Sequence, residues 1–288
     1  MAEIRPTLHV AGCGRAARTL ARLWAESGTL AIGQIMNRDP ASARRAARFI
    51  GGGEPVEHFD DRITRGWLMV GLPESALEAF VTGLRARMPG EPELCFHLSG
   101  AIGARVLEPL GCPFAAVHPV RPFARPDHAL AEFPGTWCVG EGTAVALDRV
   151  LPAFEAIGGR TVRFEARSKP LYHASTVAAA NFLVAVHRLA LELAKTAGLE
   201  EAAARQLLCD LQAASLENIR VLGPADALTG PIERGDLEAC RRLLEAVARH
   251  APAYLDEFTA LARASLDLAR TRRPGDPAWR QLAALFGD

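Results

Sequence analysis

The sequence predicts an α/β fold, in which a doubly wound parallel sheet over residues 1–168 is followed by an all-helical domain over residues 169–288. An apolar strand pattern near the start runs into a glycine-rich turn and then into a helix pattern. Strand and helix patterns go on alternating through the first half of the chain, which is typical of a parallel sheet covered by helices. Beyond Pro170 only helical patterns occur, so we expect a second domain there.

The first strand pattern ends in the motif G-x-G-x-x-A, from Gly12 to Ala17. Gly12 would let the chain turn sharply, and Gly14 would let backbone N–H groups approach a pyrophosphate. Small Ala17 would keep the following helix close to the strand. Placed between a strand and a helix, the motif predicts a dinucleotide-binding turn of the Rossmann type. The residues of this turn that we expect to contact a cofactor are Gly12, Cys13, Gly14, Arg15 and Ala16.

The residues after the second strand pattern, Leu30 to Met36, indicate which nicotinamide cofactor the turn takes. An acidic residue there binds the ribose 2′-hydroxyl of NAD, whereas an arginine accommodates the 2′-phosphate of NADP. The chain has Asn37 and Arg38 at this point, and Asp39, which precedes Pro40, is interpreted as a helix cap. The pattern therefore favours NADP over NAD. Further candidates for the phosphate are Arg15 and, more weakly, Arg44 and Arg45.

Three later strand patterns end in turns of small or polar residues. Because the carboxyl ends of parallel strands meet at one edge of a sheet, we expect these turns to line one crevice. His118 is expected on the substrate side of this crevice. The residues that we expect on its cofactor side are Leu72, Pro73, Ser99 and Gly100. The remaining strand patterns cover residues 137–140 and 161–164.

Composition excludes several other classes of function. The formal net charge is zero and the pI is about 7.1, so no basic surface for nucleic acid or an anionic membrane is expected. The six cysteines are dispersed without metal-binding spacing, which is typical of reduced cytosolic thiols and predicts no metal site. No stretch of 18 uncharged apolar residues occurs, so neither a signal peptide nor a membrane span is expected. We therefore expect a cytoplasmic protein.

The second domain opens with a nearly uninterrupted helical pattern from Leu171 to Gly198, rich in Ala, Leu and Val. Its length and all-round apolarity suggest a helix that is buried on several sides. Further helical patterns cover residues 200–222, 237–250, 252–270 and 277–286.

Polar residues interrupt the apolar surface near the start of this long helix. His173 and Asn181 share one helix face, and Lys169 lies at its head. Lys169 and Lys195 are the only lysines among 33 basic residues. A lysine beside the predicted crevice suggests an ammonium group that exchanges a proton. The alternative is that Lys169 and His173 only satisfy hydrogen bonds at the helix end and between the domains.

A loop from Gly230 to Asp236 carries a further candidate for binding. Arg234 could hold a substrate carboxylate in a forked pair, or it could pair with Asp236 across a dimer. Asp236 is expected to cap the helix that begins at Leu237.

These motifs together resemble a bacterial family that joins a Rossmann-like domain to a helical domain of unknown function. The segments that carry the resemblance are Gly12 to Ala17, His97 to Gly100, His118 to Phe123, Lys169 to His173 with Asn181, and Gly230 to Asp236. The wider similarity is to β-hydroxyacid dehydrogenases, ketopantoate reductase, pyrroline-5-carboxylate reductase and deazaflavin-dependent NADP oxidoreductases. The resemblance implies NADP binding and a homodimer formed through the helical domain.

The dehydrogenases carry a lysine and an asparagine on the helix that opens their second domain, which resembles Lys169 and Asn181. The two lie further apart here, so the identity of the acid stays open between Lys169 and His173. His173 is the first candidate because imidazole titrates in the physiological range, and Asn181 would orient the substrate.

The leading hypothesis is an NADP(H)-dependent oxidoreductase that transfers hydride to or from a small carbonyl or imine compound, such as a 2-keto or 2-hydroxy acid. One alternative is a non-catalytic NADP(H)-binding sensor or scaffold protein. Another is a deazaflavin-linked NADP oxidoreductase.

Overall fold

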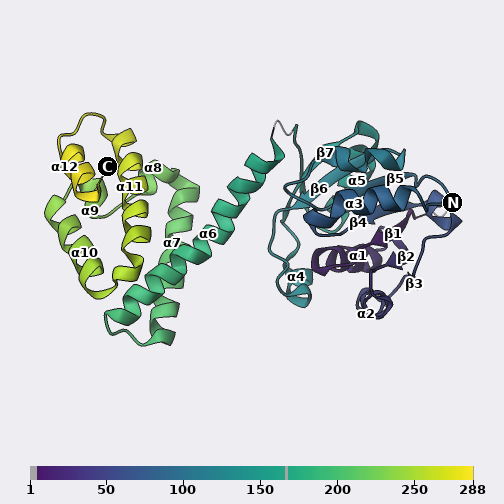
Figure 1. Ribbon diagram of the computed structural model, residues 1–288, viewed down its shortest axis with the longest axis horizontal. Helices are drawn as coiled ribbons and strands as arrows, with labels where there is room; N and C mark the ends of the chain where they lie inside the picture. Colours follow the sequence, from purple (N-terminus) through teal and green to yellow (C-terminus); the bar gives the residue numbers. More distant parts are fainter. Residues whose placement is uncertain (1–4, 166–167, 288) are drawn as a thin grey trace. The chain divides into compact units, whose positions relative to one another are not determined.

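The computed structural model describes residues 5–165 and 168–287, which divide into two compact units, Met1–Thr176 and Val177–Asp288. The first unit contains all the described strands, and the second contains only helices (Figure 1). The division falls inside α6. This helix begins at Lys169, the residue at which the sequence predicts the start of the second domain.

The described strands form one sheet in the order β3-β2-β1-β4-β5-β6-β7-β8. The first six follow the strand order of doubly wound dinucleotide-binding sheets. Their pairing is parallel from β3 through β6, as expected. The strands are β1 (Thr7–Ala11), β2 (Ala31–Met36), β3 (Glu54–Val56), β4 (Trp67–Val70), β5 (Leu94–His97), β6 (Phe114–Pro119), β7 (Trp137–Gly142) and β8 (Arg160–Arg163).

Two strands depart from the parallel sheet that the sequence predicts. β7 runs antiparallel to β6, with Cys138 opposite Pro119, and β8 runs parallel to β7. The N–H group of Val120, just past the end of β6, donates to Trp137 O at the start of β7. The chain therefore stays at the carboxyl end of β6 and turns back, because the intervening segment with α4 does not cross the sheet.

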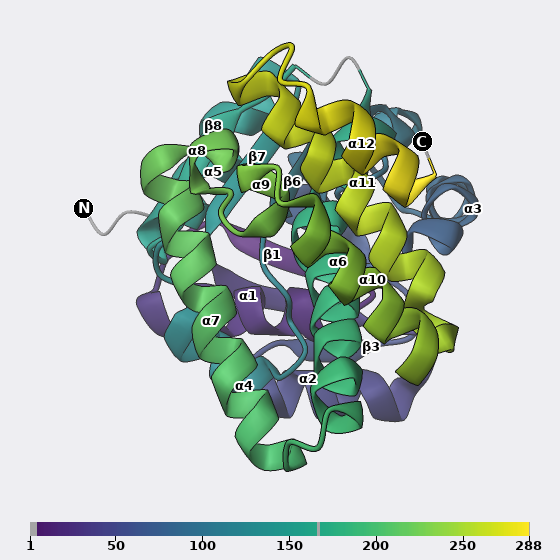
Figure 2. The same ribbon diagram turned by 90° about the vertical axis from the view of Figure 1, so that its left-hand side faces the viewer.

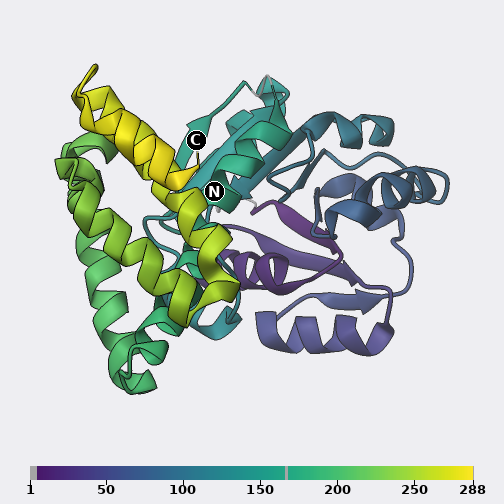
Figure 3. The same ribbon diagram turned by 60° about the vertical axis from the view of Figure 1, so that its left-hand side comes forward.

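Alternating side chains of the central strands pack on opposite faces of the sheet, which is why their patterns are apolar throughout. Leu8, Met69 and Phe96 face one core, which also takes buried residues of α1, α2 and α5. Leu68 and Cys95 face the other, which takes residues of α3 and two 3₁₀ helices. Figure 3 shows helices flanking the strands of this unit. The helical elements are α1 (Arg15–Ser27), α2 (Pro40–Ile50), η1 (Asp61–Arg65), α3 (Glu74–Arg85), η2 (Ala104–Leu110), α4 (Pro126–Glu132) and α5 (Ala144–Ala156).

Three helices of the second unit, α10, α11 and α12, lie side by side (Figure 2). They enclose a small core of their own. Leu266 of α11 is fully buried beside Cys240 of α10 and Trp279, Leu282 and Phe286 of α12. The helices that the sequence predicts here are all present. They are α6 (Lys169–Thr196), α7 (Glu201–Leu222), α8 (Pro224–Ala227), α9 (Pro231–Arg234), α10 (Leu237–His250), η3 (Pro252–Tyr254), α11 (Leu255–Arg272) and α12 (Ala278–Phe286).

The long helix α6 differs from the expectation that it is buried on several sides. Of its residues, only Lys169 and Leu189 are buried in the single chain, and large apolar residues such as Phe182 and Val184 are exposed. By length and composition alone, α6 could also cross a membrane. The sequence analysis did not anticipate this because it required a wholly apolar stretch, whereas α6 includes uncharged polar residues.

Candidate functional site

The glycine turn between β1 and α1 lies close to the end of β4. Gly12 has a φ of +78°, which favours glycine, and a Cβ atom there would lie 2.5 Å from Leu72 Cδ2. A Cβ atom at Gly71 would lie 2.6 Å from the Cβ atom of Ala17, so the helix approaches the strand as the motif predicts. Gly14 is the N-cap of α1, and no described side chain caps this helix. The first N–H groups of α1 are therefore available to an anion such as a pyrophosphate.

Asn37 connects the end of β2 to the glycine turn. Its Oδ1 atom accepts a hydrogen bond of 2.6 Å from the N–H group of Cys13. Its Nδ2 atom donates to Ser42 Oγ over 3.2 Å, at the start of α2. Asp39 caps α2 through the N–H groups of Ala41 and Ser42, as predicted, and these bonds hold the pKa of its carboxyl below the usual value. The Asn37 side chain thus orders the turn.

The candidate arginines for a 2′-phosphate are exposed around this turn. Arg38 follows Asn37 directly, and Arg44 lies on the first turns of α2. Arg15 is the first residue of α1 and donates to Ala124 O over 3.4 Å. Arg45 forms an ion pair of 3.4 Å with Asp39. Three of the four guanidinium groups are consequently free of carboxylate partners among the described residues.

The turn after β5, which contains Ser99, contacts the start of α3. Pro73 is the N-cap of α3, and Glu74 begins that helix. Glu74 Oε1 accepts a hydrogen bond of 2.6 Å from Ser99 Oγ. Ser99 Oγ in turn accepts from the N–H groups of Ala101 and Ile102, at 3.1 and 3.0 Å. The hydrogen bonds of the Ser99 hydroxyl therefore stabilise the conformation of the turn after β5.

His97 supports the same turn from inside the sheet. Its Nδ1 atom accepts from the N–H group of Ser99 at 3.1 Å, and its Nε2 atom lies 3.3 Å from Gly103 O. A neutral ring with its proton on Nε2 satisfies both contacts. Burial lowers the pKa of His97 to about 4, so the ring is neutral at pH 7.

Two histidines meet at Gly100. A Cβ atom at Gly100 would lie 2.8 Å from His173 Nδ1 and 2.9 Å from His118 Cε1, so only glycine fits without displacing a ring. The ring centroids of His118 and His173 are 6.2 Å apart. His118 Nδ1 lies 3.0 Å from the Tyr172 hydroxyl. Burial, followed by the charge of Lys169, lowers the pKa of His118 to about 4. The start of α6 thus brings Tyr172 and His173 to the ends of β5 and β6.

Lys169 is buried beside these rings. Only 6% of its side chain is exposed, and its Nζ atom has no hydrogen-bond partner among the described residues. Nζ lies 3.7 Å from Glu141 Oε1, which also accepts from the N–H group of Ala104 at 2.9 Å. Burial lowers the pKa of Lys169, and Glu141 opposes this shift. Lys169 and Glu141 are therefore paired largely out of water.

The strand register explains how Glu141 reaches this place. His97 of β5 lies opposite Ala116 of β6, and Ala116 lies opposite Glu141 of β7. Directly paired residues project from the same face of a sheet, so His97 and Glu141 belong to one row.

Several polar residues of this cluster were missed by the sequence analysis. Tyr172 lies within the segment from Lys169 to His173 that the sequence analysis used, but nothing in the sequence pattern indicated a role for its hydroxyl group. Glu74 and Glu141 belong to no motif, and only the pairing of β7 with β6 brings Glu141 to the site.

The two remaining predicted site residues belong to the second unit. Asn181 is exposed on α6, two turns after His173. Arg234 is exposed at the end of α9. Asp236 caps α10 by accepting a hydrogen bond of 3.0 Å from the N–H group of Ala239, as predicted.

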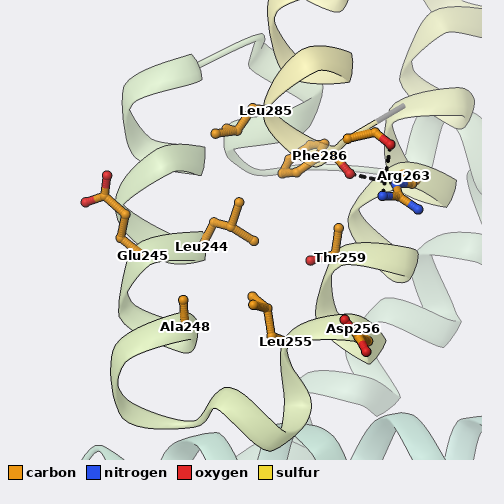
Figure 4. Close-up of a pocket in the computed structure, with 10 residues that line it drawn as sticks. Leu244, Glu245, Ala248, Leu255, Asp256, Thr259, Arg263, Leu285 and Phe286 are labelled. Atoms are coloured by element: carbon orange, nitrogen blue, oxygen red, sulfur yellow. Dashed lines mark hydrogen bonds between the residues drawn. The ribbon is translucent and has the colours of Figure 1, made fainter.

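The second unit also has a surface hollow of about 520 Å³ between α10, α11 and α12 (Figure 4). Leu244 and Leu255 line it with apolar atoms. The guanidinium of Arg263 donates to Phe286 O and Gly287 O at its rim. None of the predicted site residues lines this hollow, and its arginine is used to hold the end of α12.

One family model matches a segment that extends across both units. Residues 136–265 match the family model described as "Domain of unknown function (DUF2520)". The matched segment includes Glu141, Lys169, His173 and Asn181, but not the glycine turn. No curated protein matches the chain.

Solved structures resemble the chain over nearly its whole length. Protein TM1727 from Thermotoga maritima is 25% identical, with a TM-score of 0.67 over 92% of this chain and 100% of that one. A putative NADP oxidoreductase, BF3122 from Bacteroides fragilis, is 22% identical, with a TM-score of 0.74 over 91% and 98%. A reductive aminase from Aspergillus terreus, solved with NADPH and ethyl levulinate, is 16% identical, with a TM-score of 0.65 over 97% and 99%. Fold and matches together identify the chain as a Rossmann-like protein with a C-terminal helical domain, the organisation that the sequence analysis indicated.

Proposed function

We propose that this protein is an NADP(H)-dependent oxidoreductase that acts on a small carbonyl or imine compound. The observation that supports the proposal most strongly is a series of contacts that connects the glycine turn to His118 and His173. Leu72 packs on Gly12, Glu74 binds Ser99, and the next residue, Gly100, packs on His173. A turn that suits a dinucleotide and a cluster of titratable side chains therefore lie at the carboxyl ends of adjacent strands, which supports the proposal.

The glycine turn fits a dinucleotide. The uncapped start of α1 and the close approach of Gly12 to β4 suit a pyrophosphate, and exposed Arg15 and Arg38 suit a 2′-phosphate. Bound NADPH would supply the hydride. The similar structures support this choice of cofactor, since one is a putative NADP oxidoreductase and two others are complexes with NADPH or NADP+.

In this proposal His173 is the proton donor. Its ring lies at Gly100 and is only partly buried, so a substrate can reach it. Lys169 Nζ is wholly buried, which favours a role in setting the charge around the histidines over direct contact with substrate. Neutral His118, hydrogen-bonded to Tyr172, would contribute a second polar contact to the substrate.

Asn181 and Arg234 complete the proposal. Both are exposed in the second unit. The amide of Asn181 is the group that we propose to orient a substrate, and the guanidinium of Arg234 is the group that we propose to bind a carboxylate in a forked pair. An Arg234 contact would favour 2-keto acids and imino acids over neutral carbonyl compounds.

The test is a panel of 2-keto acids, neutral ketones and cyclic imines, with and without amines, followed by the loss of NADPH absorbance. We expect turnover of at least one class, and loss of that turnover in His173→Ala with NADPH binding retained. Tight NADPH binding without turnover of any class would instead favour a non-catalytic sensor or scaffold protein.

For the exposed apolar surface of α6 and α7 we propose a second copy of the chain as the partner, in a cytoplasmic homodimer. Large apolar side chains are exposed along both helices, including Phe182, Val184, Leu207 and Leu211. Two long helices with such a surface suit a self-complementary interface. Light scattering should give twice the chain mass for the wild type and a smaller mass for Leu211→Glu. A monomeric wild type, or extraction only with detergent, would contradict this assembly.

A further inference from the structure

Two buried cysteines lie side by side on the face of the sheet that carries the candidate site. Cys95 is in the middle of β5 and is fully buried, and Cys112 lies in the short connection from η2 to β6 with 9% exposed. The backbone joins these segments, because the N–H group of Cys95 donates to Pro113 O at 2.9 Å. Both thiols pack in the same apolar core.

The two sulfur atoms are 3.4 Å apart, within hydrogen-bond distance. A disulfide needs about 2.0 Å, so the sulfurs must approach by about 1.4 Å. No other pair of cysteines in the described part of the chain is in such contact, and all six thiols are free.

We propose that Cys95 and Cys112 form a site of reversible oxidation, at which a hydroperoxide converts the thiol pair into a disulfide. Cys112 is the attacking residue because it is the more accessible of the two. The hydrogen bond with Cys95 also lowers the pKa of the Cys112 thiol, which favours its thiolate.

The chemistry balances in two steps. The Cys112 thiolate attacks the hydroperoxide, giving a sulfenic acid and releasing an alcohol, or water when the oxidant is hydrogen peroxide. The Cys95 thiol then attacks the sulfenic sulfur, so that the S–S bond forms and water leaves. The peroxide is reduced by two electrons and the two thiols are oxidised by two. A dithiol reductant reverses the change.

Oxidation would close a loop that contains part of the candidate site. The segment between the two cysteines includes His97, Ser99 and Gly100. A covalent link across its ends restricts the movement of this turn relative to β6. We therefore expect slower amide exchange over residues 99–103 in the oxidised protein.

The experiment is peptide mapping of the full-length protein after hydrogen peroxide treatment, with free thiols blocked by N-ethylmaleimide. Trypsin places Cys95 in peptide 88–105. It places Cys112 in peptide 106–149, because Arg121 and Arg125 each precede proline. Since that peptide also contains Cys138, a second cleavage at Glu132 is needed to separate the two cysteines.

We expect a joined pair of peptides that has lost two hydrogens and that separates with dithiothreitol. Cys138→Ser and Cys209→Ser should leave this product unchanged, whereas Cys112→Ser should abolish it and leave Cys95 free. Oxidation of Cys112 only to sulfinic acid, or a joined peptide that contains Cys138 instead, would overturn the proposal. The wild-type map decides the question even where Cys112→Ser folds poorly, and unchanged exchange over residues 99–103 would contradict the link to the site.

Discussion

The ammonium of Lys169 lies 3.7 Å from the carboxylate of Glu141, and 6% of the lysine side chain and 19% of the glutamate side chain are exposed. An ion pair so far from water depends on both partners, because removing one leaves the other charge buried without compensation. The same ammonium charge helps to keep His118 unprotonated. Glu141 therefore influences the histidines of the site through Lys169.

Replacing Glu141 by glutamine should lower the pKa of Lys169. Glutamine keeps an oxygen for the N–H group of Ala104 but removes the negative charge that stabilises the ammonium. Because the chain has only two lysines, ¹³C labelling of the lysine ε-carbon gives two titration curves. Lys195 is the internal control, since Glu192 and Glu201 raise its pKa independently. An unchanged Lys169 curve in E141Q would show that the pair is not coupled.

Replacing Gly100 by alanine should displace the ring of His118 or His173. The new Cβ atom would lie under 3.0 Å from both rings. Overpacking of this kind costs about 1–3 kcal/mol of stability, and we expect turnover to fall by at least tenfold. Gly103→Ala is the matched control, because its nearest neighbour, Glu141 Oε1, would be 3.6 Å away. Thermal unfolding and turnover of the two variants check the prediction, and equal behaviour would contradict it.

Replacing Arg38 by alanine should weaken NADPH binding selectively. A charge-assisted contact to a 2′-phosphate contributes about 1.5–3 kcal/mol, which corresponds to roughly 10- to 150-fold in affinity. NADH affinity should not change, since NADH has no such phosphate. Arg48→Ala, an exposed arginine in the last turn of α2, is the control. Fluorescence titration with both cofactors measures the effect, and an equal loss for NADH would argue against this contact.

Acid should destabilise the first unit between pH 6.5 and 4. His97 and His118 have pKa values of about 4 in the folded chain and 6.5 as the ordinary value. The unfolded chain therefore binds more protons in this interval, and the free energy of unfolding decreases as the pH falls, by at most about 3 kcal/mol for each histidine. Denaturant unfolding at several pH values checks this. His97→Asn should reduce the slope, and a slope identical to that of the wild type would exclude His97 as a source.

Local patterns predicted the parts of the site that depend on neighbouring residues. The turn at Gly12, the caps at Asp39 and Asp236, and the segment from Lys169 to His173 each follow from residues a few positions apart. Glu141 could not be predicted in this way, because its place depends on β7 running antiparallel to β6. The exposure of α6 was also unpredictable, since apolar residues alone do not show which surface covers them.

The most direct test of the proposed activity is to follow the hydride itself. NADPH that carries deuterium at C4 of the nicotinamide ring should be incubated with the best substrate of the panel, and the product should be analysed by mass spectrometry. We predict one deuterium per product molecule with the wild type, and little product with Gly100→Ala. A product without deuterium from either C4 position, or NADPH that stays intact while bound, would contradict an oxidoreductase built on this site.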